Sequence, residues 1–168
     1  MKLTVSIIAA IDESNALGAN NALLWDIPED VALFKQLTLR CPVIMGKKTF
    51  ESLGNKPLTN RLNIVLTHDK KFSKKDVYSA NTLSSALRIA NKIGDEEVFI
   101  IGGGEIFKQV LDEDLVDTMY ITHIQKTYKE ATCFFPKINA KKWKVVKEEE
   151  IKTKNGLKVI FKKYEKIK

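Results

Sequence analysis

The sequence predicts an α/β fold: one domain over residues 1–168, with a mainly parallel central sheet of about eight strands, flanking helices and a C-terminal antiparallel hairpin. Three observations predict it. Short apolar runs alternate with helical segments, as in parallel strands joined by crossover helices. Residues 3–10 form a continuous apolar run, the pattern of a strand buried on both faces. The Asn155-Gly156 pair separates two alternating segments, which indicates a hairpin turn.

The other elements follow along the chain. Residues 11–27 show no period and include Asn15, Gly18, Asn20 and Asn21, so we expect an irregular loop that acts as a lid. Pro28 suits a first helical position and opens a helix. Thr82 and Ser85 begin another helix, which Gly94 ends. The remaining expected elements are strands at 42–46, 61–67, 77–79, 98–101 and 118–125, and helices at 47–53 and 104–111.

Composition indicates a soluble globular protein, since 44% of the 168 residues are hydrophobic and 29% are charged. No apolar run approaches the roughly 20 residues of a membrane span. Cys41 and Cys133 have no CxxC spacing, and only two histidines are present, so we expect reduced thiols and no metal site. We predict a cytoplasmic monomer without membrane contact.

The formal charge of +7 is concentrated in one segment. Residues 137–168 hold 12 lysines and four glutamates, whereas the other 136 residues hold 16 basic and 17 acidic side chains. The lysines alternate with Val, Ile and Phe, as on the solvated face of a sheet. This pattern argues against nucleic acid as the partner, although a basic surface also attracts small anions.

Asp30 is the most informative residue for function. Positions i+3, i+4 and i+7 from it are Leu33, Phe34 and Leu37, so its carboxylate shares a helical stripe with large apolar side chains. A buried carboxylate needs a raised pKa or a bound partner. The alternative is an ordinary first-turn acid that is stabilised by the helix dipole, a role that Glu29 fills equally well.

Phosphate-binding residue types occur at three strand ends. Gly102-Gly103-Gly104 follows a strand and opens a helix, Gly46-Lys47-Lys48-Thr49 repeats the arrangement, and Thr67-His68 ends a third strand. Together they favour one long anionic cofactor such as a dinucleotide, and the adjacent lysines favour a 2′-phosphate. The alternatives are a structural glycine turn and solvated surface lysines. Arg61, one of three arginines, suits a carboxylate because its guanidinium binds in a bidentate manner.

In order and spacing, these motifs resemble the dihydrofolate reductase family from about residue 3 to the C-terminus. The resemblance rests on four segments: Leu24–Asp30 with Phe34-Lys35, Pro42–Leu53, Ile101–Phe107 and Tyr120–Ile124. It implies hydride transfer from NADPH to dihydrofolate, in one-carbon and tetrahydrofolate metabolism, and plausible binding of antifolate inhibitors. It also implies a cis peptide between Gly102 and Gly103.

The resemblance further implies residue roles. The catalytic set is Asp30, Trp25, Thr122 and Leu23, in which Asp30 binds the pterin, Thr122 shares its network and Trp25 holds a water. The substrate set is Ile8, Asp30, Val31, Phe34, Ser52, Leu53, Leu58, Arg61, Ile101 and Thr122. The cofactor set is Ala10, Ile11, Leu17, Gly18, Asn21, Leu23, Met45, Gly46, Lys47, Lys48, Thr49, Leu66, Thr67, His68, Ile101, Gly102, Gly103, Gly104, Glu105, Ile106 and Phe107.

The sequence departs from the family pattern in three places. Phe107 stands where many members have tyrosine, Leu24 replaces a frequent proline, and Ala131 stands where an acid is common. Because of Ala131, the resemblance does not establish hydrogen bonding between that loop and the lid. Two other functions are alternatives: the pyrimidine reductase of riboflavin biosynthesis, against which Asp30 and Arg61 argue, and a non-enzymatic anion- or RNA-binding protein that uses the lysine-rich segment.

Overall fold

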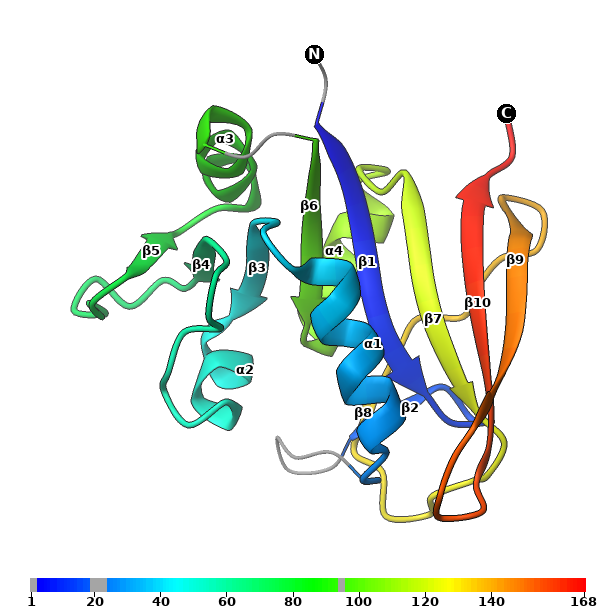
Figure 1. The fold of residues 1–168 in the computed structure, drawn as a ribbon. Helices are drawn as coiled ribbons and strands as arrows, with labels where there is room; N and C mark the ends of the chain where they lie inside the picture. The colour runs from blue at the N-terminus through cyan, green and yellow to red at the C-terminus, as the bar shows by residue number, and fades with distance from the viewer. Residues whose placement is uncertain (1–2, 19–23, 94–95) are drawn as a thin grey trace.

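The computed structural model describes residues 3–18, 24–93 and 96–168. Its main sheet has eight strands in the order β5-β4-β3-β6-β1-β7-β10-β9 (Figure 1). In that order the bounds are Val77–Ala80, Asn63–Leu66, Val43–Gly46, Glu97–Gly102, Thr4–Ile11, Thr118–Ile124, Lys158–Lys166 and Trp143–Lys152. In the sheet order, the first six strands, from β5 through β7, pair in parallel with their neighbours. Strand β10 is antiparallel to both β7 and β9. The predicted fold class is therefore confirmed.

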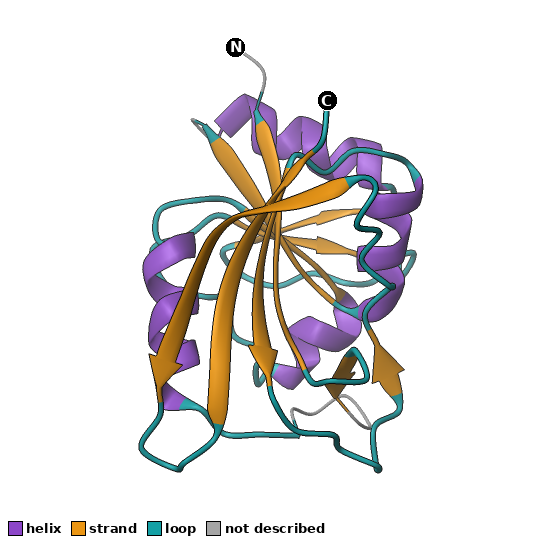
Figure 2. Ribbon diagram, turned by 90° about the vertical axis from the view of Figure 1, so that its right-hand side faces the viewer, coloured by secondary structure: helices purple, strands orange, loops and turns teal. Residues whose placement is uncertain are grey.

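Helices lie on both faces of the sheet (Figures 1 and 2). Their bounds are α1 Pro28–Thr38, α2 Lys47–Ser52, α3 Leu83–Ile93 and α4 Gly104–Asp112. The predicted helix starts are confirmed at Pro28 and at Thr82, whose hydroxyl accepts the Ser85 N–H at 3.1 Å. The predicted stop at Gly94 lies outside the described residues.

The core consists of two main layers, because successive residues of each buried strand face opposite sides of the sheet. On one side, Ile7, Ile44 and Ile100 pack with Ala86 of α3 and Val110 of α4. On the other side the sheet residues Ile8, Val43, Met45, Val65 and Phe99 pack with Phe50 of α2 and Phe34 of α1. This double burial explains why the strands read as continuous apolar runs.

One expectation is wrong in part. Residues 11–27 were expected to be irregular, yet Ala16–Gly18 forms a short strand, β2, which pairs antiparallel with β8, Cys133–Phe134. Three residues are too few to show a period, and the partner lies more than 100 residues further along the chain. The rest of the predicted lid, residues 19–23, lies outside the described residues.

No helix among the described residues is long and apolar enough to cross a membrane.

Candidate active site

A cleft of about 2080 Å³ follows the carboxyl ends of β1, β3, β4 and β6. The loops and helix starts at this edge of an α/β sheet are its usual ligand site. Pockets for one small ligand reach about 1,000 Å³. The cleft is therefore larger than one small ligand requires.

Helix α1 supplies one wall. Its apolar side chains Val31 and Phe34 line the cleft, and Val31 is 58% exposed. Only Thr38 of this helix is fully buried. An exposed apolar helix face beside a cleft is suited to an apolar or aromatic ligand.

Asp30 lies on the same wall. Its Oδ1 accepts a hydrogen bond from the Thr122 hydroxyl of β7 at 2.6 Å. Burial raises the pKa of Asp30, and the Thr122 hydrogen bond opposes that rise only in part. The first-turn acid of the alternative interpretation is Glu29, which accepts the Lys154 N–H at 3.0 Å. Asp30 is instead a desolvated carboxylate at a ligand cleft.

Arg61 lines the cleft from the segment just before β4. Its Nε donates to the Thr59 carbonyl at 2.8 Å and its Nη1 donates to the Thr38 hydroxyl at 3.0 Å. Partial burial lowers its pKa, and no acidic side chain within the described ranges forms an ion pair with it. A held and partly desolvated guanidinium with donors to spare is suited to a ligand carboxylate.

The glycine triplet forms the base of the cleft at β6. The Gly102-Gly103 peptide is cis, as the family resemblance implied, and Gly102 has a φ of +124°, which a side chain rarely adopts. A Cβ on Gly104 would lie 3.0 Å from Cys133 Sγ and 3.1 Å from the Phe134 carbonyl oxygen, so glycine is also needed for β8 to pack here. Because α4 begins at Gly104, the amides of Gly104 and Glu105 precede the first bonded turn, in which the Ile106 and Phe107 N–H groups donate to the Gly103 carbonyl, and such amides suit a phosphate.

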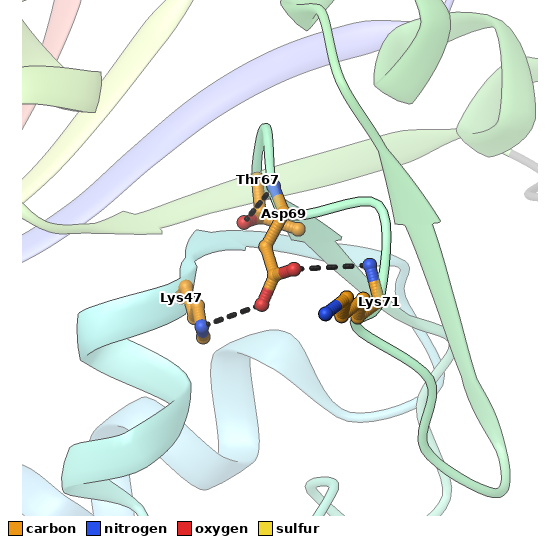
Figure 3. Close-up of polar contacts among 4 residues, drawn as sticks. All are labelled: Lys47, Thr67, Asp69 and Lys71. Atoms are coloured by element: carbon orange, nitrogen blue, oxygen red, sulfur yellow. Dashed lines mark hydrogen bonds and ion pairs between the residues drawn. The ribbon is translucent and has the colours of Figure 1, made fainter.

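Cationic and hydroxyl groups gather at the ends of β3 and β4. Lys47, Lys48, Thr49, Thr67 and His68 all line the cleft. Lys47 Nζ also forms an ion pair with Asp69 Oδ2 at 2.9 Å, on the loop that follows β4 (Figure 3). These residue types fit the phosphates of a nucleotide, and the acid partner of Lys47 was not expected from the sequence.

Most predicted site residues meet in this one cleft. Besides the residues already placed there, its lining includes Ile8, Ala10, Leu17, Gly18, Gly46, Ser52, Leu53, Leu58, Leu66, Ile101, Gly102, Gly103, Gly104, Glu105, Ile106 and Phe107. Phe107 is 2% exposed and packs against Phe135 with ring centroids 5.1 Å apart. An apolar ring suits that dry position, where many family members have tyrosine.

Four predicted residues lie behind the lining. Thr122 is connected to the cleft by the hydrogen bond that its hydroxyl donates to Asp30. Ile11 and Met45 are 1% and 0% exposed because their side chains point into the core. Trp25 packs with Ile27, Ile124 and Val159, and its proposed water-holding role stays a prediction. Asn21 and Leu23 lie outside the described residues.

Sequence reasoning missed several residues of the site. Outside the cleft lining, the sequence also did not reveal Asp12, which is 2% exposed and bridges two loops: Oδ1 accepts the Ser14 and Ala16 N–H groups and Oδ2 accepts the Tyr128 N–H, each at 2.8 Å. The Thr132 N–H also donates to the Gly18 carbonyl at 3.0 Å, so the loop stays bonded to β2 despite Ala131. The missed lining residues include Lys56, Pro57, Thr59, Asn81 and Thr132–Pro136.

The fold and the cleft are typical of one class: α/β proteins that bind a nucleotide at the carboxyl ends of their parallel strands. Within the described residues, no group of three or more histidine, cysteine or acidic side chains is placed to hold a metal ion.

Comparisons with known proteins support the same class and identify a family. The dihydrofolate reductase family model matches residues 4–166. The chain is 37% identical to the dihydrofolate reductase of Buchnera aphidicola (subsp. Baizongia pistaciae) over 98% of this chain and 99% of that protein. It is 40% identical to that of Haemophilus influenzae over 85% of each. The structure of Enterococcus faecalis dihydrofolate reductase, complexed with NADP(H) and RAB-propyl, superposes with a TM-score of 0.89 at 29% identity, covering 98% of this chain and 97% of that one.

The chain belongs to the dihydrofolate reductase family. The predicted family is thereby confirmed, and the alternatives of a pyrimidine reductase and an RNA-binding protein are not favoured.

Proposed function

We propose that this chain reduces 7,8-dihydrofolate to 5,6,7,8-tetrahydrofolate by hydride transfer from NADPH, and so supports one-carbon and thymidylate metabolism. The single observation that carries the proposal is Asp30, a desolvated carboxylate on the cleft wall that is bonded to the Thr122 hydroxyl. Family membership supports the same reaction.

Asp30 binds and polarises the substrate ring. Thr122 donates to Oδ1, so Oδ2 is the oxygen available to the 2-amino group and N3 of a pterin. Apolar cleft residues such as Phe34 and Leu53 cover the ring and the aminobenzoyl group, and Arg61 binds the glutamate α-carboxylate. The proton that N5 gains comes through water, and Asp30 forms no covalent intermediate.

The cofactor half of the cleft fits NADPH. The cis peptide, the glycines and the first amides of α4 present backbone N–H groups, Lys47 and Lys48 present cations, and His68 presents a hydrogen-bonding ring. NADPH supplies the hydride when bound. Ala10, Ile101 and Phe107 present mainly apolar side chains at the same cleft, which excludes water from the reacting carbon.

We further propose that the enzyme acts as a monomer in the cytoplasm. Cys41 and Cys133 are both free thiols, as a reducing compartment favours. The edge strand β9 carries lysines and glutamates along its exposed residues, which discourages pairing with a second sheet. Sedimentation at micromolar concentration would show a 19.1 kDa species.

The proposed reaction is tested by mixing the protein with NADPH and dihydrofolate and following absorbance at about 340 nm. We expect a steady loss with NADPH and a slower loss with NADH. The variant Asp26→Asn, which removes an exposed acid that does not line the cleft, is expected to match the unmodified protein. No absorbance change with either cofactor would overturn the proposal.

A further inference from the structure

The Lys47 ammonium can pair either with Asp69 or with an anionic ligand in the cleft. Lys47 lines the cleft, and it also forms the ion pair with Asp69 at 2.9 Å (Figure 3). The Asp69 hydrogen bond is the main cause that raises the pKa of Lys47, and the Lys47 hydrogen bond is the main cause that lowers the pKa of Asp69. Their side chains are 40% and 39% exposed, so both remain accessible to solvent and to a ligand.

Asp69 is the fixed member of this pair. Its Oδ1 accepts the Lys71 N–H at 2.9 Å, and its own N–H donates to the Thr67 hydroxyl at 3.1 Å. Lys47 has a long flexible side chain and is the member that can turn toward a ligand. Any anion that recruits Lys47 must therefore do so against a carboxylate that the loop holds in place.

We propose that Asp69 is a specificity-determining residue: by pairing with Lys47, it weakens binding of the adenosine 2′-phosphate and so moderates the preference for NADPH over NADH. The inference rests on the proposed function, since it needs the cofactor at this end of the cleft. A phosphate monoester carries about −1.5 to −2 charges at pH 7, whereas the 2′-hydroxyl of NADH carries none. Asp69 therefore opposes one cofactor and leaves the other unaffected.

The size of the effect follows from the exposure of the pair. Exposed ion pairs are worth about 0–1 kcal/mol, and 1.4 kcal/mol corresponds to a tenfold change in affinity. Asn in place of Asp69 keeps an oxygen that accepts the Lys71 N–H, and it removes both the charge and the oxygen that accepts from Lys47. We expect Asp69→Asn to raise affinity for 2′-phosphorylated nucleotides by about two- to fivefold.

The experiment is calorimetric titration of the full-length protein with 2′,5′-ADP and, separately, with 5′-AMP at about 50 mM salt. Asp69→Asn is expected to tighten 2′,5′-ADP and to leave 5′-AMP unchanged. The gain is expected to shrink at about 500 mM salt, because screening weakens exposed charges. An unchanged or lowered preference for 2′,5′-ADP in this variant would overturn the inference.

Two further variants isolate the pair. Asp114→Asn removes a carboxylate that forms an ion pair with Lys166 at 2.6 Å, away from the cleft lining, and is expected to change neither titration. In a Lys47→Gln background, the effect of Asp69→Asn is expected to be smaller. An equal gain in both backgrounds would show that Lys47 does not mediate the effect and would overturn the inference.

The two proposals fail in different ways. Protein that oxidises NADPH with dihydrofolate and binds 2′,5′-ADP, yet shows no effect at Asp69, would overturn the inference alone. Protein that binds neither nucleotide and oxidises neither cofactor would overturn the proposed function, and the inference with it.

Discussion

At the residue scale, Asp30 lies at a position where burial disfavours the charged form of its carboxyl group. Burial raises its pKa above the ordinary aspartate value of 3.8, and the hydrogen bond from Thr122 offsets this rise only in part. The unfolded chain therefore releases this proton at lower pH than the folded protein does. Ionisation of Asp30 costs folding stability as pH rises from 3.8 to the raised folded pKa, and the cost is fully present above it.

We predict that Asp30→Asn lowers turnover by roughly 10²-fold or more, because a key acid–base group is lost. The same variant should raise the Tm at pH 7, by about 2–4 °C for each kcal/mol relieved in a domain of this size. The Tm gain should vanish below pH 3.8, where the carboxyl is protonated in both states. Steady-state kinetics and calorimetric melting measure the two effects, and turnover like that of the unmodified protein would refute the role of Asp30.

The guanidinium of Arg61 is held by two neutral oxygens, so its remaining donors suit a carboxylate. We predict that Arg61→Lys raises the KM for dihydrofolate by about 10- to 100-fold, since a charged hydrogen bond is worth about 1.5–3 kcal/mol. Kinetics with a dihydropterin that lacks the glutamate should show no change in KM. Arg88→Lys, on the exposed part of α3, is the matched control, and equal effects on both substrates would argue against a carboxylate clamp.

At the element scale, the sequence predicts the long elements well and the short ones poorly. The strands around Ile7 and Ile44 are readable because burial on both faces demands continuous apolar runs. Strands β2 and β8 have three and two residues, and only their long-range pairing defines them. The cleft residues on β8 and the Asp12 bridge were missed for the same reason.

Asp12 connects β2, through the Ala16 N–H, to the loop that contains Tyr128, a contact that was not predictable from the sequence. Burial alone would raise its pKa, but hydrogen bonds from Tyr128, Ala16 and Ser14 outweigh that effect and lower it. A carboxylate with a lowered folded pKa adds stability that is fully present above the unfolded value of 3.8 and is lost as pH falls through the folded pKa.

We predict that Asp12→Asn costs about 1–3 kcal/mol of unfolding free energy at pH 7, because an amide cannot accept on both sides and leaves the Tyr128 N–H without its acceptor. Denaturant unfolding at several pH values measures this cost, which should shrink as the pH falls below 3.8. Glu13→Gln, at the exposed neighbouring residue, is the control and should cost little. A loss that does not depend on pH would argue against the charge of Asp12 as its cause.

At the scale of the whole molecule, the site is predictable because the parallel sheet gathers distant segments at one edge. Asp30, Arg61, Lys47 and the glycine triplet are far apart in sequence, yet all line one cleft. Their chemistry was readable from residue type and position relative to strand ends. The Lys47–Asp69 pair was not readable, because it depends on how the loop after β4 folds back toward α2.

The same sheet couples the stability of the core layers on its two faces. Its two main core layers share strands, since Ile7 packs in one layer and Ile8 in the other. We therefore predict one cooperative unfolding transition for residues 1–168, with fluorescence and circular dichroism curves that coincide. NADPH at 100 times its Kd should stabilise the fold by about 2.7 kcal/mol and shift the entire transition by about 5–10 °C. Two separate transitions, or a shift in only one of the two signals, would contradict a single domain built around this cleft.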